Sequence, residues 1–128
     1  SLNGRVTLLF VLMLGEGAGL IWFSHSESVA MAIVAMLSFG LCVHMACGAT
    51  YALTPFVDKR ALGGVTGIIG AGGNVGAVAA GFLMKGVGDT QHTLSILGFF
   101  VVLSAVCAIA ARFSAATNAE HALAPATA

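Results

Sequence analysis

Apolar residues fill four long runs of this chain, and polar residues gather in the short pieces between them. The runs cover residues 6–23, 29–54, 63–84 and 94–113. The pieces that separate them read SHSES, PFVDKRAL and KGVGDTQH. Each run is near or above the roughly 20 residues that a helix needs to cross a hydrocarbon core about 30 Å thick. The pattern therefore predicts four membrane-spanning segments.

These segments are predicted to be helices, because hydrocarbon offers no partner for unpaired backbone N–H and C=O groups. Pro55 is expected to end the second one, since proline lacks an N–H and disfavours helix in the residue before it. Residues 114–128 are small and polar, which predicts a poorly ordered tail. The predicted fold class is all-α: a polytopic membrane protein with four transmembrane helices within residues 1–113.

Composition supports a lipid environment. Of the 128 residues, 59% are hydrophobic and 8% are charged, whereas soluble domains carry about 25% charged residues. Five basic and five acidic residues give a formal net charge of zero, so the chain lacks the basic patch that nucleic acid requires. The predicted partner is therefore the lipid bilayer, with no nucleic acid partner.

The basic residues predict an orientation. Four of the five flank one predicted side of the membrane: Arg5, Lys59, Arg60 and Arg112. Lys85 falls on the other side, because it follows the third of four antiparallel spans. Basic residues favour the cytoplasmic side. We therefore expect a multi-pass protein of the cell membrane, with both ends of this piece in the cytoplasm.

The stretch GIIGAGGNVGAVAAG, residues 67–81, has two interpretations. Gly70, Gly72 and Gly76 have the spacing of a dinucleotide-binding turn, which needs a strand before it and an acidic residue about 20 positions later. No alternating strand–helix pattern surrounds the stretch, and the neighbouring apolar runs are too long for strands. A glycine-rich membrane helix is therefore the predicted structure.

In such a helix, small residues and one amide share a face about 80° wide. The members of this face are Gly63, Gly67, Gly70, Asn74, Ala77 and Gly81. Small residues at four-residue spacing let membrane helices approach closely, so packing alone explains the glycines. Asn74 near mid-membrane suggests in addition that a substrate passes along this face. The two interpretations are compatible, and both stay open.

Residues 48–83, GATYALTPFVDKRALGGVTGIIGAGGNVGAVAAGFL, resemble the second nitrate-signature region of the nitrate/nitrite porter family of the major facilitator superfamily. The matching positions are Gly67, Gly70, Ala71, Gly72, Gly73, Asn74 and Gly76. The NGR at residues 3–5 suits the loop before the ninth helix of that family. The resemblance implies a fold of twelve spans in two six-helix halves, of which this chain would be helices nine to twelve.

The same resemblance implies a function. The substrates would be nitrate and nitrite, with protons as candidate co-substrates, and the remaining eight helices of the transporter would be partners. The implied substrate-binding or pore-lining residues are Gly67, Gly70, Gly72, Gly73, Gly76 and Asn74. Two arginines of the second and eighth helices would bind the anion, and both are outside this chain. We therefore expect the chain to be an incomplete carboxyl-terminal piece that does not transport nitrate alone.

The predicted function is secondary transport of nitrate or nitrite by alternating access. One alternative is a small structural four-helix membrane protein that packs with a partner. Another is a major facilitator transporter of a different small anion.

Three further side chains are candidates for function. Glu16 and His44 lie about ten residues, or ~15 Å, from the same end of their spans. Ionisable groups inside a membrane usually face a partner or a cavity, so the two are either a proton relay or a neutral pair that fixes helix packing. Tyr51, one turn before Pro55, is either an inner gate or an interfacial anchor.

The sequence indicates no catalytic chemistry. It shows no Ser–His–Asp or paired-carboxylate arrangement. Cys42, His44 and Cys47 are close in sequence, but these positions do not share a helix face, and a metal site needs three or four convergent ligands. The chain is therefore predicted to be neither an enzyme nor a binder of metals or cofactors.

Overall fold

The computed structural model describes residues 2–58 and 60–110, and its helices follow the four apolar runs. The elements are α1 (Leu2–Ser24), α2 (Val29–Leu53), the 3-10 helix η1 (Thr54–Phe56), α3 (Leu62–Val87) and α4 (Thr90–Ala110). All four α-helices are long and apolar enough to cross a membrane. No strand occurs among the described residues. The predicted all-α polytopic fold is thereby confirmed.

The helix ends differ from the predicted spans by a few residues. Helices α1 and α4 each begin four residues earlier than predicted, because polar residues of the interface continue the helical backbone. Helix α2 ends at Leu53, and Pro55 lies in the short η1. The end of the fourth predicted span and the predicted tail, residues 111–128, lie outside the described residues, as do Lys59 and Arg112.

Short caps begin or end the helices at the turns between them. The Ser28 hydroxyl accepts the Met31 N–H at 3.2 Å and caps the start of α2. Gly88, with φ of 70°, takes the left-handed conformation that ends α3. The Asp89 carboxylate then accepts the Gln91 N–H at 2.9 Å and caps the start of α4. These caps satisfy backbone groups that the first and last helical turns leave unpaired.

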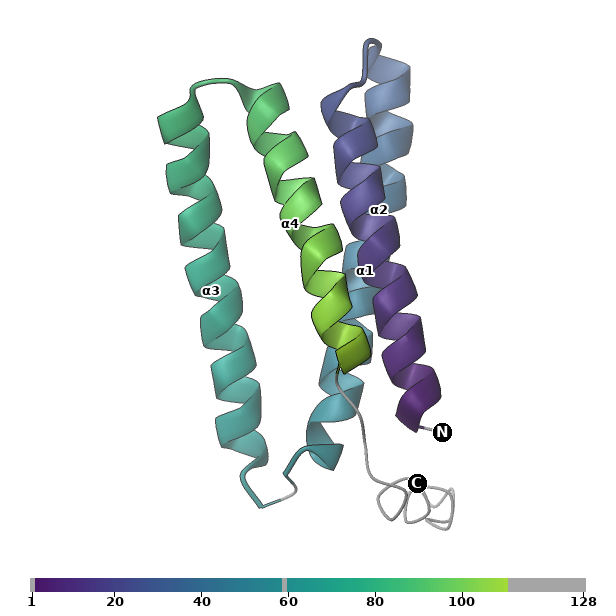
Figure 1. Cartoon of the computed structure of the whole chain (residues 1–128), viewed down its shortest axis with the longest axis vertical. Helices are drawn as coiled ribbons and strands as arrows, with labels where there is room; N and C mark the ends of the chain where they lie inside the picture. Colours follow the sequence, from purple (N-terminus) through teal and green to yellow (C-terminus); the bar gives the residue numbers. More distant parts are fainter. Residues whose placement is uncertain (1, 59, 111–128) are drawn as a thin grey trace.

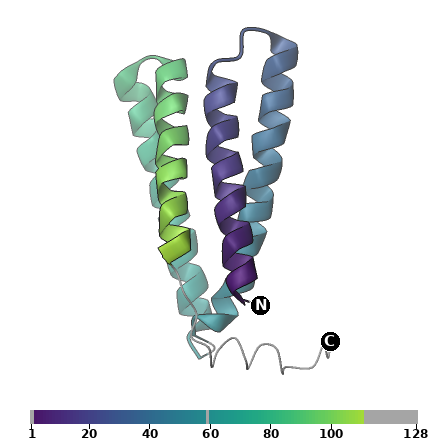
Figure 2. The same ribbon diagram turned by 45° about the vertical axis from the view of Figure 1, so that its right-hand side comes forward.

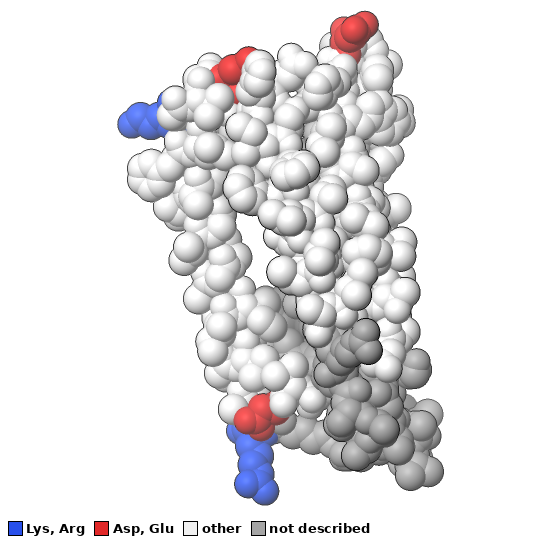
Figure 3. Space-filling view, in the orientation of Figure 1, with Lys and Arg blue, Asp and Glu red and all other residues white. Residues whose placement is uncertain are grey.

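The helices run antiparallel to one another in chain order (Figure 1). Helix α1 is central, because it packs against both α2 and α4, whereas α3 touches mainly α4 and η1 (Figures 1 and 2). On the face shown in Figure 3, acidic and basic side chains gather at the two ends and uncharged surface lies between them. The same view shows an opening beside α3, about halfway along its length. Three helices thus form a packed group, and α3 stands apart from it.

Glycines of α1 allow this close packing. A Cβ atom on Gly19 would lie 2.7 Å from Cβ of Phe39 in α2, and one on Gly15 would lie 3.0 Å from Sγ of Cys42. On the opposite side of α1, a Cβ atom on Gly17 would lie 2.8 Å from the Gly98 carbonyl oxygen of α4. The sequence GEGAG therefore serves two interfaces, since residues two apart point to opposite sides of a helix.

Candidate functional site

Helices α2 and α3 together line a pocket with a volume of about 430 Å³. Its lining residues come from two facing segments: Cys47, Thr50 and Tyr51 of α2, and Ile69, Gly70, Gly73 and Asn74 of α3. The glycines of α3 leave room for the pocket because they present no side chain. Tyr51 places the pocket near the end of α2, close to η1.

The structure brings some of the predicted site residues together and separates others. Gly70, Gly73 and Asn74 line the pocket with Tyr51, the predicted inner gate. Gly67 belongs to the same predicted face but is not among the lining residues. Gly72 and Gly76 are likewise not among the lining residues. Three of the six signature positions therefore line the pocket.

No residue of the described chain packs against the glycines of α3. A Cβ atom added at any glycine of Leu62–Val87 would find no heavy atom of another described residue within 4 Å. The helix also has no buried residue. The close approach that the sequence suggested for α3 is therefore absent among the described residues, and it occurs instead at Gly15, Gly17, Gly19 and Gly98.

Glu16 and His44 do not form a bonded pair. Among the described residues, no hydrogen bond or ion pair joins them. Glu16 is half-buried and His44 is exposed. Cys42 faces Gly15 of α1, and His44, two residues later, lies about 200° further around α2. His44 thus shares the face of Cys47 and Tyr51, which is the side of α2 that lines the pocket.

The pocket offers neutral polar groups. The Asn74 amide, the Tyr51 hydroxyl and the Cys47 thiol are donors along its wall. The Thr50 hydroxyl lines the pocket as well, but it donates to the Ala46 carbonyl at 2.9 Å. No Lys, Arg, Asp or Glu is among the lining residues. This arrangement suits hydrogen bonding to a small polar solute and supplies no charge to an ion.

The remaining candidate chemistry is sparse. No group of three or more metal-ligating side chains occurs in the described part of the chain. Cys42, Cys47 and Cys107 are free thiols. At the opposite end of the bundle from the N-terminus, the Asp89 carboxylate accepts a hydrogen bond from His92 Nδ1 at 2.6 Å. This bond and that from the Gln91 N–H hold the pKa of Asp89 below its ordinary value.

Sequence reasoning missed two features of this arrangement. The first is the close contact of α1 with its neighbours, which the four-residue spacing of Gly15 and Gly19 could have indicated, since small residues at this spacing are typical of helix interfaces. The second is the place of Cys47 in the pocket lining. Its position one turn before Tyr51 places both on one helix face, and this spacing could have indicated their shared environment.

Four apolar helices with a neutral pocket between two of them define a helical multi-pass membrane protein. The chain is 34% identical to the high affinity nitrate transporter 2.5 of Arabidopsis thaliana over 111 residues, 85% of this chain and 22% of the relative. It is 36% identical to nitrate transporter 2.1 of Chlamydomonas reinhardtii over 105 residues, 80% of this chain and 19% of the relative.

It is also 35% identical to the nitrate/nitrite transporter NrtP of Picosynechococcus sp. over 82 residues, 62% of this chain and 15% of the relative. No family model and no solved structure matches the chain. By homology, the chain belongs to the nitrate/nitrite transporter family, which confirms the resemblance of residues 48–83. It spans about a fifth of the length of the curated relatives that it matches.

Proposed function

We propose that this chain is part of a secondary transporter of nitrate and nitrite in the cell membrane. Its relatives carry the names of nitrate and nitrite transporters rather than of enzymes, so we propose a transport role and no catalysis. The observation that carries the proposal is the pocket between α2 and α3, in which three signature residues face Tyr51. In this proposal the pocket is a section of the substrate pathway.

The Asn74 amide and the Tyr51 hydroxyl have defined roles in this pathway. Nitrate and nitrite carry hydrogen-bond acceptors, and both side chains can donate to them. Asn74 would bind the anion from α3, and Tyr51 would close the pathway from α2 as the inner gate. Gly70 and Gly73 would leave space for the anion to pass between the two helices.

The charge of the anion requires groups outside this chain. An ion in a low-dielectric environment needs a charged partner or dense hydrogen bonding. The basic residues of the described helices, Arg5 and Lys85, lie in terminal turns. We propose that further helices complete the transporter, eight by the family resemblance, and that they supply the compensating arginines. The chain's coverage of about a fifth of its relatives supports this arrangement.

The packing of the helices is compatible with alternating access. Helices α1, α2 and α4 are held together by contacts at glycines and by a hydrogen bond between Ser24 and Ser95 at 2.7 Å. Helix α3 has no buried residue, and its glycine faces are uncovered within the described chain. We propose that these faces slide against other helices of the transporter as the pathway opens alternately to each side.

Two other predictions belong to this proposal. The end of the bundle that carries Arg5 and Arg60 would be cytoplasmic, as the bias of basic residues suggests.

A proton relay through Glu16 and His44 would need water or other residues between them, because no bond joins the pair. Proton-coupled uptake that persists unchanged in a His44→Gln transporter would remove His44 from any such relay.

The experiment is nitrate uptake by the complete transporter that contains this chain, reconstituted in vesicles with isotopically labelled nitrate. Asn74→Ala should lower kcat/KM about tenfold or more, which is the cost of losing a hydrogen bond to a charged group. Asn3→Ala is the matched control, because Asn3 is exposed at the start of α1. Unchanged uptake by Asn74→Ala would overturn the role of the pocket.

A further inference from the structure

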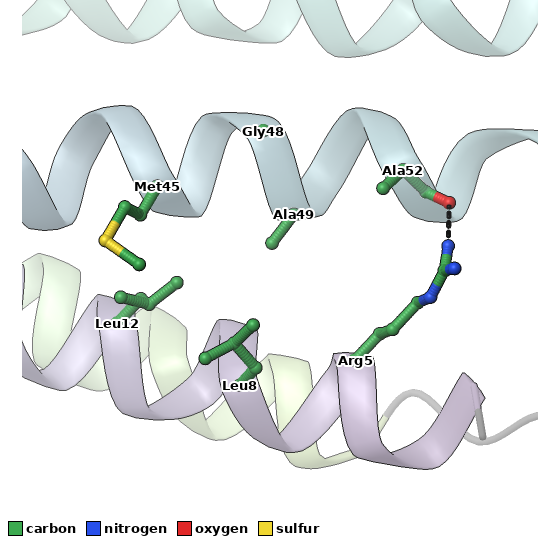
Figure 4. A pocket seen from close by; sticks show the side chains of 7 residues that line it. All are labelled: Arg5, Leu8, Leu12, Met45, Gly48, Ala49 and Ala52. Atoms are coloured by element: carbon green, nitrogen blue, oxygen red, sulfur yellow. Dashed lines mark hydrogen bonds between the residues drawn. The ribbon is translucent and has the colours of Figure 1, made fainter.

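A second groove lies between α1 and α2 (Figure 4), and none of its lining residues lines the α2–α3 pocket. Its volume is about 320 Å³. Its walls are apolar and come from Leu8 and Leu12 of α1 and from Met45, Gly48, Ala49 and Ala52 of α2. Gly48 leaves the groove open, since nothing lies within 4 Å of the position that its Cβ would take.

A fixed cation lies at one end of this groove. The Arg5 Nη1 donates to the Ala52 carbonyl oxygen at 3.2 Å (Figure 4). The guanidinium also lies 5.6 Å from the centre of the Phe56 ring. These two contacts hold the guanidinium at the mouth of the groove. A guanidinium has five N–H donors, and the bond to Ala52 uses one of them.

The groove has the dimensions and polarity of one end of a lipid. From Arg5 to Leu12 the α1 helix rises about 10 Å, so the groove extends from the helix end about a third of the way across the hydrocarbon core. Its apolar walls suit an acyl chain, and the guanidinium at the helix end suits a phosphate. Basic groups between membrane helices are common sites for anionic lipid head groups.

We propose that the groove between α1 and α2 binds one acyl chain of an anionic phospholipid, whose phosphate is held by Arg5. The acyl chain fills the space over Gly48, and the phosphate accepts N–H bonds that the Ala52 carbonyl leaves available. Charge complementarity at the mouth selects an anionic lipid over a zwitterionic one. This site is separate from the α2–α3 pocket and does not depend on its substrate.

The test uses the complete transporter in nanodiscs of phosphatidylcholine with a minor fraction of phosphatidylglycerol of the same acyl chains. Lipids retained after extraction in neutral detergent are counted by native mass spectrometry. Arg5→Gln should lower the preference for phosphatidylglycerol about fivefold, the effect of one basic group at an anionic surface. Arg5→Lys should keep the preference, because the charge remains. Arg60→Gln is the charge control at the same end of the bundle.

A second variant tests the acyl chain separately. Gly48→Leu would place a side chain in the groove, where a Cβ at Gly48 meets open space, and should abolish retention of the lipid. Gly40→Leu is the matched control, because its Cβ also finds nothing within 4 Å and Gly40 is outside the groove. The proposal is overturned if Arg5→Gln keeps the preference or if Gly48→Leu keeps the lipid. Absence of retained lipid in the unaltered protein, as when another helix covers the groove, would overturn it as well.

Discussion

Gly17 and Gly98 meet where α1 crosses α4, with their backbones in direct contact. A Cβ atom on Gly17 would lie 2.8 Å from the Gly98 carbonyl oxygen, and one on Gly98 would lie 2.9 Å from the Gly17 carbonyl oxygen. Both obstacles are backbone atoms, which cannot turn aside as a side-chain end can. The crossing therefore requires glycine on both helices and fixes the distance between them.

This relationship predicts that Gly17→Ala and Gly98→Ala each destabilise the bundle by about 1–3 kcal/mol, the usual cost of overpacking. Thermal unfolding of the detergent-solubilised transporter, followed by size-exclusion chromatography, measures the effect as a lowered midpoint. Gly40→Ala is the matched control, because a Cβ atom there meets open space. Equal midpoints for all three variants would contradict the close crossing.

Gly72→Val is expected to abolish nitrate uptake while leaving insertion and folding intact. Within the described chain, a Cβ at Gly72 meets nothing within 4 Å, so these helices leave open space at the start of the added side chain. Loss of uptake would then report a neighbour that approaches α3 from elsewhere in the transporter. The measurements are uptake in vesicles and the amount of folded protein in the membrane.

Gly40→Val provides the comparison for this variant, since Gly40 has the same open surroundings but lies on α2. Normal uptake by Gly72→Val would count against the sliding of α3 past other helices.

Much of the fold could be predicted from the sequence, because each helix is specified by its own apolar run. Asn74 and Gly70 could be assigned to one face from helical periodicity alone, and the structure places both in one pocket. The partner of that face could not be predicted, since the rotation of α2 depends on which residues pack against α1. Cys42 takes that position, which turns His44 away from Glu16.

The three cysteines predict a pattern of reactivity in the complete transporter. Cys47 lines the α2–α3 pocket and should react with a charged, membrane-impermeant thiol reagent once the pathway is open to water. Cys42 is packed against Gly15 and should react slowly. Nitrate should slow the modification of Cys47, because both would occupy the pocket.

Single-cysteine variants and mass spectrometry of the labelled protein separate these rates. Cys107 serves as the reference on α4, because it lies outside the pocket. A Cys47 that reacts no faster than Cys42 would argue against a water-filled pathway at this pocket.

The pair of Asp89 and His92 predicts a defined response to acid. The hydrogen bond from His92 lowers the pKa of Asp89, as does the backbone N–H of Gln91. A lowered carboxyl pKa means that the folded state favours the carboxylate. The stabilising cap on α4 is therefore fully present above the pH range in which an ordinary carboxyl group titrates. It is lost as the pH falls through the lowered pKa of Asp89.

His92→Ala should move the Asp89 midpoint upward, because the larger of the two hydrogen bonds is removed. A carbon-13 NMR titration of the Asp89 carboxyl measures the midpoint directly. His25→Ala is the control for the loss of a histidine. The His25 ring bonds elsewhere, to the Ile21 carbonyl oxygen and the Ser24 hydroxyl. An unchanged midpoint in His92→Ala would show that the backbone N–H alone lowers the pKa.

The four helices alone should not carry nitrate across a membrane. The α2–α3 pocket has no Lys or Arg in its lining, and a neutral wall does not repay the cost of moving an anion out of water. The chain by itself, reconstituted in vesicles, is therefore expected to take up labelled nitrate no faster than protein-free vesicles do. The complete transporter in the same lipid is the positive control. Uptake by the four helices above background would mean that Asn74, Tyr51 and the backbone around Gly70 suffice to compensate the charge of nitrate. The proposed arginines of other helices would then be unnecessary.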